Sequence, residues 1–153
     1  MQKILFLDFD GVLHPPPTSV PGSWQVVLDS SSFFLPALVQ RVLRIVRETG
    51  CEIVVSSAWR VDFSVDQFNQ IFDGKVTGIT PTLDLPISAY KEGLVRYREV
   101  QDYLAYEVTG TPSWVAIDDQ SKHFPEQPNI VITDPQIGVT EQQADLCIKL
   151  LQP

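Results

Sequence analysis

Cysteine and histidine are scarce in this chain of 153 residues, which contains two of each. Cys51 and Cys147 lie far apart and form no metal-ligand spacing with His14 or His123. The sequence therefore excludes a disulfide-rich scaffold and shows no recognisable cysteine–histidine metal site. We expect both thiols to be buried and reduced, which is typical of a cytoplasmic protein.

Long apolar runs and an excess of basic residues are also absent. No run approaches the ~20 residues that a membrane span needs, and Met1 leads into a strand without the features of a signal peptide. The chain has 19 acidic and 11 basic residues, a formal net charge of −8, which argues against extended contacts with nucleic acid. The length and the hydrophobic content of 44% predict a single domain, residues 1–153, with no membrane association.

What the chain does contain is a strand that ends in two carboxylates. Residues 3–14 read KILFLDFDGVLH, so that Asp8, Asp10 and Gly11 follow an unbroken apolar run. Such a run is typical of a strand buried on both faces of a parallel sheet, and open α/β sheets place active sites at the carboxyl ends of their strands. Neighbouring carboxylates repel each other unless a cation or a shared proton relieves them. The pattern therefore indicates a divalent cation beside Asp8 and Asp10.

Predicted strands and helices alternate along the rest of the chain. Strands separated by helices favour a mostly parallel, doubly wound sheet. We therefore expect an α/β fold: a single Rossmann-like domain with a five-stranded sheet and helices on both faces. Apolar periodicity predicts helices at residues 34–49, 62–72, 99–107 and 140–151, the last with a capping box, and further strands at 52–57, 76–79, 113–117 and 129–133.

Two segments depart from this alternation. Residues 14–32 are rich in proline and serine, with one short apolar piece at 26–28; this predicts a loop or flap, with a small hairpin, over the strand end that carries the aspartates. Residues 58–95 form a small insertion with a helix, a strand and an irregular stretch at 80–90. Neither segment has room for a large cap domain, so we expect an open site that the 14–32 flap covers in part.

Three strands of such a sheet bring polar side chains to one edge. These are Asp8 and Asp10, Ser56 and Ser57, and Asp118 and Asp119. Hard oxygen ligands of this kind suit Mg²⁺, which keeps several waters and completes its shell with substrate phosphate. One carboxylate beside that ion can attack phosphorus and form an aspartyl-phosphate, while another moves the proton. The sequence thus predicts a Mg²⁺ cofactor and phosphoryl chemistry.

The segments FLDFDGVLH, VVSSAWR and WVAIDDQ, in this order, resemble the motifs of the haloacid dehalogenase-like (HAD) hydrolase superfamily. The resemblance spans residues 3–150, and VLHP, SSxWR and TDPxxGVT are similar to the HAD domains of RNA-repair-like proteins. It implies a lidless HAD-like fold, a Mg²⁺ cofactor and a phosphoric monoester hydrolase. Lidless members often act on phosphates that larger molecules present, so the implied partner is a phosphorylated substrate such as a nucleic-acid end.

The resemblance also assigns roles to four aspartates. Asp8 matches the nucleophile and a metal ligand, and Asp10 matches the general acid/base, with its backbone carbonyl on the metal. Asp118 and Asp119 match the acidic pair; we favour Asp118 as the direct ligand and Asp119 as a ligand through water. All four are intact, which favours an enzyme over the alternative, a HAD-fold module that binds phosphate and metal without turnover.

The phosphate-binding residues are less closely fixed. Ser56 matches the hydroxyl that the family places after its second strand; Ser57 replaces it if the strand runs one residue longer, and a helix cap is the structural alternative for Ser56. The family supplies a cation near the start of the helix before the fourth strand, and here the sequence departs from the pattern. Arg98 is the preferred candidate, with Arg96 and Lys91 as alternatives.

Three residues near these motifs have two interpretations each. Arg60 either contacts the substrate, supplying the missing cation, or forms a structural ion pair. His14 either faces the substrate or packs within its loop. Trp59 is predicted to pack in the core rather than to form a platform for the substrate.

Overall fold

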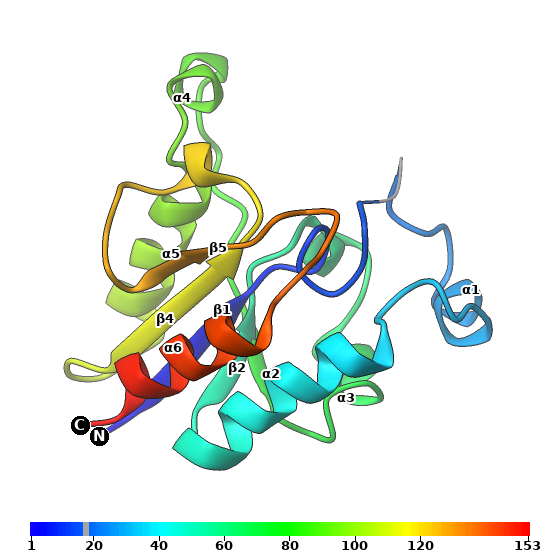
Figure 1. The fold of residues 1–153 in the computed structure, drawn as a ribbon. Coiled ribbons are helices and arrows are strands. Elements are labelled where there is room, and N and C mark those ends of the chain that lie inside the picture. Colours follow the sequence, from blue (N-terminus) through cyan, green and yellow to red (C-terminus); the bar gives the residue numbers. More distant parts are fainter. Residues whose placement is uncertain (17–18) are drawn as a thin grey trace.

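The computed structural model describes residues 1–16 and 19–153, apart from the side chain of Lys91. Its centre is a parallel sheet of five strands in the order β3-β2-β1-β4-β5 (Figure 1). The predicted α/β class and the parallel direction are confirmed. The strands are β1 (Lys3–Leu7), β2 (Glu52–Val55), β3 (Val76–Ile79), β4 (Ser113–Asp118) and β5 (Ile130–Ile132).

The central strand β1 pairs with β2 on one side and with β4 on the other, so the strand order reverses beside it. In open α/β sheets a reversal of this kind opens a crevice at the carboxyl ends of the strands. Leu7, the last residue of β1, is in register with Val55 and Ile117. The next residue of each strand segment therefore lies at the same level of the sheet. These residues are Asp8, Ser56 and Asp118.

Helices cover both faces of the sheet, as predicted. In Figure 1, α2 and α6 lie together over one face and α5 lies over the other. Leu5 and Leu7 pack into the core beneath α2 and α6, whereas Ile4 and Phe6 pack beneath α5. The helices are α1 (Trp24–Asp29), α2 (Pro36–Thr49), α3 (Val65–Asn69), α4 (Ile87–Glu92), α5 (Val95–Tyr106) and α6 (Glu141–Leu151), with 3₁₀ turns η1 (Ala58–Val61) and η2 (Ser121–His123).

The ends of the long helices follow from local sequence chemistry. Helix α2 has proline in its first turn, where no backbone donor is needed, and ends at Gly50 in the left-handed conformation with φ 71°. Helix α6 begins with the predicted capping box, in which the side chains of Thr140 and Gln143 bond each other's backbone N–H groups.

Segment 14–32 contains a helix, α1, where a small hairpin was predicted. The helix forms because the Ser23 hydroxyl accepts a hydrogen bond from Val26 N. Its first residue, Trp24, is buried against Phe63 and Phe68. Residues 17 and 18 of this segment lie outside the described residues. The idea that the segment covers the aspartates stays a prediction.

The insertion 58–95 also differs from its predicted form. The helix expected at 62–72 is shorter, because η1 takes its own turn before Ser64 caps α3. Helix α4 lies partly in the stretch 80–90 that was predicted to be irregular. Helix α5 begins at Val95, earlier than the 99–107 prediction. Among the described residues, no helix combines the length and apolar character that crossing a membrane requires.

Candidate metal and phosphate site

Three carboxylates meet at the carboxyl ends of β1 and β4. Asp8, Asp118 and Asp119 each place one oxygen so that all three oxygens lie within 4.8 Å of one another. Asp8 and Asp118 are buried, and Asp119 is half-buried. Asp118 Oδ1 also accepts a hydrogen bond of 2.8 Å from Gln120 N, which fixes the turn after β4. The structure therefore brings together these candidates from distant parts of the sequence.

The electrostatics of this cluster favour a bound cation. Burial raises the pKa of Asp8 well above its usual value, and the neighbouring charge of Asp118 raises it further. Burial, together with Asp119, raises the pKa of Asp118 to about 7. Three carboxylates this close together are a set of hard oxygen donors, and a divalent ion would relieve their mutual repulsion. The residues therefore fit a divalent metal ion, with Asp8, Asp118 and Asp119 as the side chains that would hold it.

Gly11 is required by the close approach of this cluster to the loop after β1. Its φ is +75°, and a Cβ built at this position would overlap the Asp119 carboxylate. Its carbonyl oxygen accepts a 2.7 Å hydrogen bond from Thr133 Oγ1, which ties the loop to the end of β5. A glycine directly after Asp10 is therefore part of how the site is built.

Asp10 stands beside the cluster and has its own support. Its side chain is 30% exposed, and Oδ1 accepts a 3.0 Å hydrogen bond from Trp59 Nε1. Burial raises the pKa of Asp10, and the bond from Trp59 works in the opposite direction. His14 Nε2 lies 3.3 Å from the same oxygen without forming a hydrogen bond. His14 is 1% exposed, so the structure favours its packing interpretation over contact with substrate.

The two serines after β2 have different surroundings. Ser57 Oγ accepts a 3.2 Å hydrogen bond from Trp59 N and caps η1. Ser56 Oγ is buried and has no hydrogen-bond partner within residues 1–16 and 19–153. A buried hydroxyl without a partner is costly unless something else bonds it. Ser57 is therefore the cap, and Ser56 keeps a hydroxyl available for a ligand.

Arg96 supplies positive charge to the carboxylates. Its Nη1 donates a 2.9 Å hydrogen bond to Glu99 Oε2 one turn along α5. Burial works to lower the pKa of Arg96, but Glu99, Asp8 and Asp118 outweigh it and raise that pKa. In return, the guanidinium lowers the pKa values of Asp8 and Asp118 against the effect of burial. The Arg96 side chain is thus a permanent cation within electrostatic reach of the cluster.

Arg98, the preferred candidate from the sequence, is placed differently. Its side chain is exposed, and it makes no ion pair within the part of the chain that the structure describes. Two residues along a helix turn a side chain by about 200°, so Arg96 and Arg98 cannot share a face. The structure therefore favours Arg96 over Arg98. The side chain of Lys91, the third candidate, lies outside the described residues.

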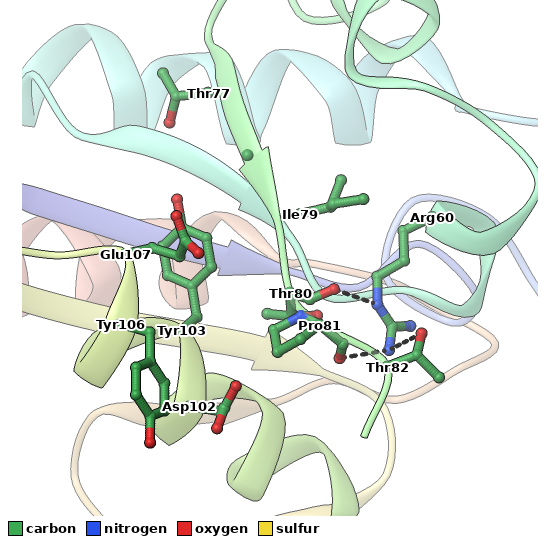
Figure 2. Close-up of a pocket in the computed structure, with 11 residues that line it drawn as sticks. Arg60, Thr77, Ile79, Thr80, Pro81, Thr82, Asp102, Tyr103, Tyr106 and Glu107 are labelled. Atoms are coloured by element: carbon green, nitrogen blue, oxygen red, sulfur yellow. Dashed lines mark hydrogen bonds between the residues drawn. The ribbon is translucent and has the colours of Figure 1, made fainter. Parts of the chain in front are cut away.

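Arg60 forms the structural ion pair that was one of its two interpretations. Its Nη2 lies 3.0 Å from Glu99 Oε1, and both side chains are buried. Figure 2 shows the guanidinium bonded to the loop after β3, where Nε donates to Thr80 O at 2.9 Å. A further bond of 2.8 Å reaches Ser57 O. Arg60 and Arg96 therefore share Glu99, a residue that sequence reasoning did not single out although it follows Arg96 at the (i, i+3) spacing.

Two cavities border this ion-pair network. One, of about 290 Å³, is lined by residues that include Tyr90, Arg96, Lys122 and His123. Burial, with Arg96 and Lys122 nearby, lowers the pKa of His123 to about 4, so this imidazole is neutral. The other cavity, of about 470 Å³, lies between β3 and α5 and has no aspartate of the cluster in its lining (Figure 2). The first lining has no aspartate of the cluster either, but it contains Arg96, which connects this cavity with the candidate site.

The parallel sheet, the crevice beside β1 and the acidic cluster define an α/β domain of the HAD type. A protein-family model described as the HAD domain in Swiss Army Knife RNA repair proteins matches residues 4–144. The chain belongs to this family, and its fold is that of a HAD hydrolase. A comparison with curated proteins found no match. The predicted resemblance, including the RNA-repair-type subgroup, is confirmed.

The acidic cluster predicts how stability changes with pH. The folded protein binds a proton at Asp118 more tightly than the unfolded chain does, because the pKa is raised from 3.8 to about 7. The charge of Asp118 therefore destabilises the metal-free fold above about pH 7, and this penalty fades as the pH falls toward 4. We expect Asp118→Asn to raise the Tm of metal-free protein by roughly 5 °C or more at pH 8 and much less at pH 5.

Scanning calorimetry in EDTA at the two pH values measures this difference. Comparison with wild type at each pH is needed because the pKa values of His14 and His123 are lowered, which destabilises the fold toward acid pH. Asp84→Asn, at an exposed loop position, is the matched control and should change the Tm equally little at both. In wild type, Mg²⁺ should raise the Tm at pH 8, and Asp118→Asn should reduce that rise. An Asp118→Asn effect independent of pH would contradict the raised pKa.

Proposed function

We propose that this protein is a Mg²⁺-dependent phosphatase that hydrolyses phosphomonoesters through an aspartyl-phosphate on Asp8. The observation that carries the proposal is the arrangement at the strand ends: a buried acidic cluster, the cation of Arg96, and a buried Ser56 hydroxyl that has no hydrogen-bond partner in the part of the chain that the structure describes. An acidic cluster alone would attract a cation. The addition of a donor and a positive side chain at the same edge suits an anionic phosphoryl group.

Each residue has a role in this reaction. Asp8 attacks phosphorus and forms a covalent phosphoryl intermediate. When bound, Mg²⁺ neutralises charge between the anionic nucleophile and the anionic phosphate. Ser56 and Arg96 donate hydrogen bonds to the phosphoryl oxygens, whose charge they stabilise. Asp10 gives a proton to the leaving oxygen and later takes one from the water that hydrolyses the intermediate.

The cavity beside Arg96 supports a proposal for the rest of the substrate. Its lining carries Arg60, Arg96 and Lys122 against the single carboxylate of Glu99, in a chain whose net charge is −8. A leaving group with further negative charge suits this lining. The family's description as a domain of RNA repair proteins points the same way, and we propose that a terminal phosphate on a nucleic acid is the substrate.

The test is phosphate release by the purified protein. We expect 4-nitrophenyl phosphate to be hydrolysed in Mg²⁺ and not after EDTA treatment, and oligonucleotides with a 5′- or 3′-terminal phosphate to be better substrates than small esters. The same oligonucleotides without the phosphate serve as competitors. If Mg²⁺ and orthovanadate bind, as shown by a raised Tm, while no ester is hydrolysed, the alternative of a phosphate-binding module replaces the phosphatase.

A further inference from the structure

Asp10 is held by a residue to which no motif gives a catalytic task. Trp59 is completely buried, and its indole Nε1–H donates a 3.0 Å hydrogen bond to Asp10 Oδ1. The Asp10 side chain itself is 30% exposed. Trp59 therefore holds one carboxylate oxygen from within the core, while the Asp10 side chain stays partly exposed.

The other neighbour of that oxygen cannot do the same. His14 Nδ1 lies 2.9 Å from the carbonyl oxygen of Pro15. A carbonyl oxygen only accepts, so Nδ1 carries the proton in this contact. His14 Nε2 lies 3.3 Å from Asp10 Oδ1 but forms no hydrogen bond within the described residues. The donor that fixes Asp10 Oδ1 is Trp59.

The indole is itself firmly fixed. Four phenylalanine rings pack around it with centroids between 5.2 and 5.8 Å away: Phe9, Phe33, Phe34 and Phe63. The backbone of Trp59 is held as well, because its N–H donates to the Ser57 hydroxyl. A side chain packed in this way has little rotamer freedom. It therefore fixes the direction of the N–H bond that meets Asp10.

We infer that Trp59 is the positioning residue for the general acid/base: its indole N–H occupies Asp10 Oδ1, so that Asp10 Oδ2 carries and receives the proton. The inference rests on the proposed function. In the first half-reaction, the Oδ2 proton passes to the leaving-group oxygen as the P–O bond breaks and the bond from Asp8 to phosphorus forms. In the second, the Asp10 carboxylate takes a proton from the water that attacks phosphorus and releases Asp8.

If Trp59 positions the general acid Asp10, its loss should have a specific kinetic effect. An alkoxide is a poor leaving group and needs its proton in the transition state, whereas 4-nitrophenolate leaves with little help. Loss of the Trp59 donor should therefore affect alkyl esters more than the aryl ester. The relevant constant is kcat/KM, because it covers the steps through cleavage of the first P–O bond and excludes hydrolysis of the aspartyl-phosphate.

The test compares Trp59→Phe with wild type on 4-nitrophenyl phosphate and on an alkyl phosphate in Mg²⁺. We expect kcat/KM for the alkyl ester to fall about tenfold or more, with little change for the aryl ester. Trp24→Phe is the matched control: Trp24 is also buried, contacts Phe34 and Phe63, and donates a 3.1 Å bond to Gln70 Oε1. Trp24→Phe should lower the Tm by a similar amount and leave the ratio of kcat/KM for the alkyl ester to kcat/KM for the aryl ester unchanged.

A second variant removes the donor without changing the packing. 3-Benzothienylalanine at position 59 keeps the shape of the indole and replaces N–H by sulfur, so it should reproduce the selective loss on the alkyl ester. Equal losses on both esters, or a ratio the same as that of Trp24→Phe, would overturn the positioning role. Absence of Mg²⁺-dependent turnover in wild type would instead overturn the proposed phosphatase, and this inference with it.

Discussion

Asp8→Asn is expected to abolish phosphatase turnover and, at the same time, to raise the Tm of the metal-free protein. Asparagine has nearly the shape of aspartate but cannot act as the nucleophile that forms the acyl phosphate. It also removes one charge from a buried cluster in which burial and Asp118 raise the pKa of Asp8. The Asp8 carboxylate is therefore required for catalysis, although the metal-free protein would be more stable without its charge.

Two measurements on one preparation check this prediction. Turnover of 4-nitrophenyl phosphate in Mg²⁺ should fall by about 10³-fold or more, the loss expected when a covalent mechanism loses its nucleophile. The Tm in EDTA at pH 8 should rise, whereas the exposed control Asp84→Asn should change neither quantity. Retained turnover in Asp8→Asn would exclude an intermediate on this residue, and a lower Tm would show that the carboxylate is held by partners rather than strained.

The carboxylates could be predicted from sequence because each directly follows a recognisable strand. An apolar run fixes where β1 ends, and parallel pairing then places Asp8 and Asp118 at the same level of the sheet. Information within a few residues of each strand end was sufficient for these aspartates. The need for glycine at position 11 was not predictable in this way, because it comes from the close approach of Asp119, which is distant in sequence.

The partners of these residues could not be predicted in this way, because they come from distant segments. Trp59 bonds an aspartate 49 positions earlier in the chain, and a buried tryptophan is more often simply part of a core. Glu99 pairs with both Arg60 and Arg96. Its polar side chain gave no sign of burial, since glutamate on a helix is usually exposed.

The sequence could not decide between Ser56 and Ser57 because it does not fix the last residue of β2. Element boundaries shift by one or two residues, and the strand end decides which hydroxyl caps and which stays available. Helix α1 was missed because residues 24–29 are too short a segment to display a helical period. Its stability depends on the Ser23 cap and on the tertiary contact of Trp24 with Phe63, which only the folded chain provides.

Arg96→Ala is expected to lower kcat/KM by about 10²–10³-fold, the cost of removing one preorganised donor to developing charge. Arg98→Ala should change it less than about twofold, because Arg98 is exposed on another face of α5. The fold should survive the loss of Arg96, since the buried Glu99 carboxylate keeps its 3.0 Å ion pair with Arg60.

The pH dependence separates an electrostatic role of Arg96 from a general loss of packing. Its guanidinium lowers the pKa of Asp8, so its removal raises that pKa, and the nucleophile ionises at higher pH. The rising limb of kcat/KM against pH should therefore move to higher pH in Arg96→Ala and stay in place in Arg98→Ala. Equal effects of the two alanines would exclude Arg96 as the phosphate-facing cation. Because both residues lie on one helix two positions apart, the comparison measures which face of α5 borders the phosphate.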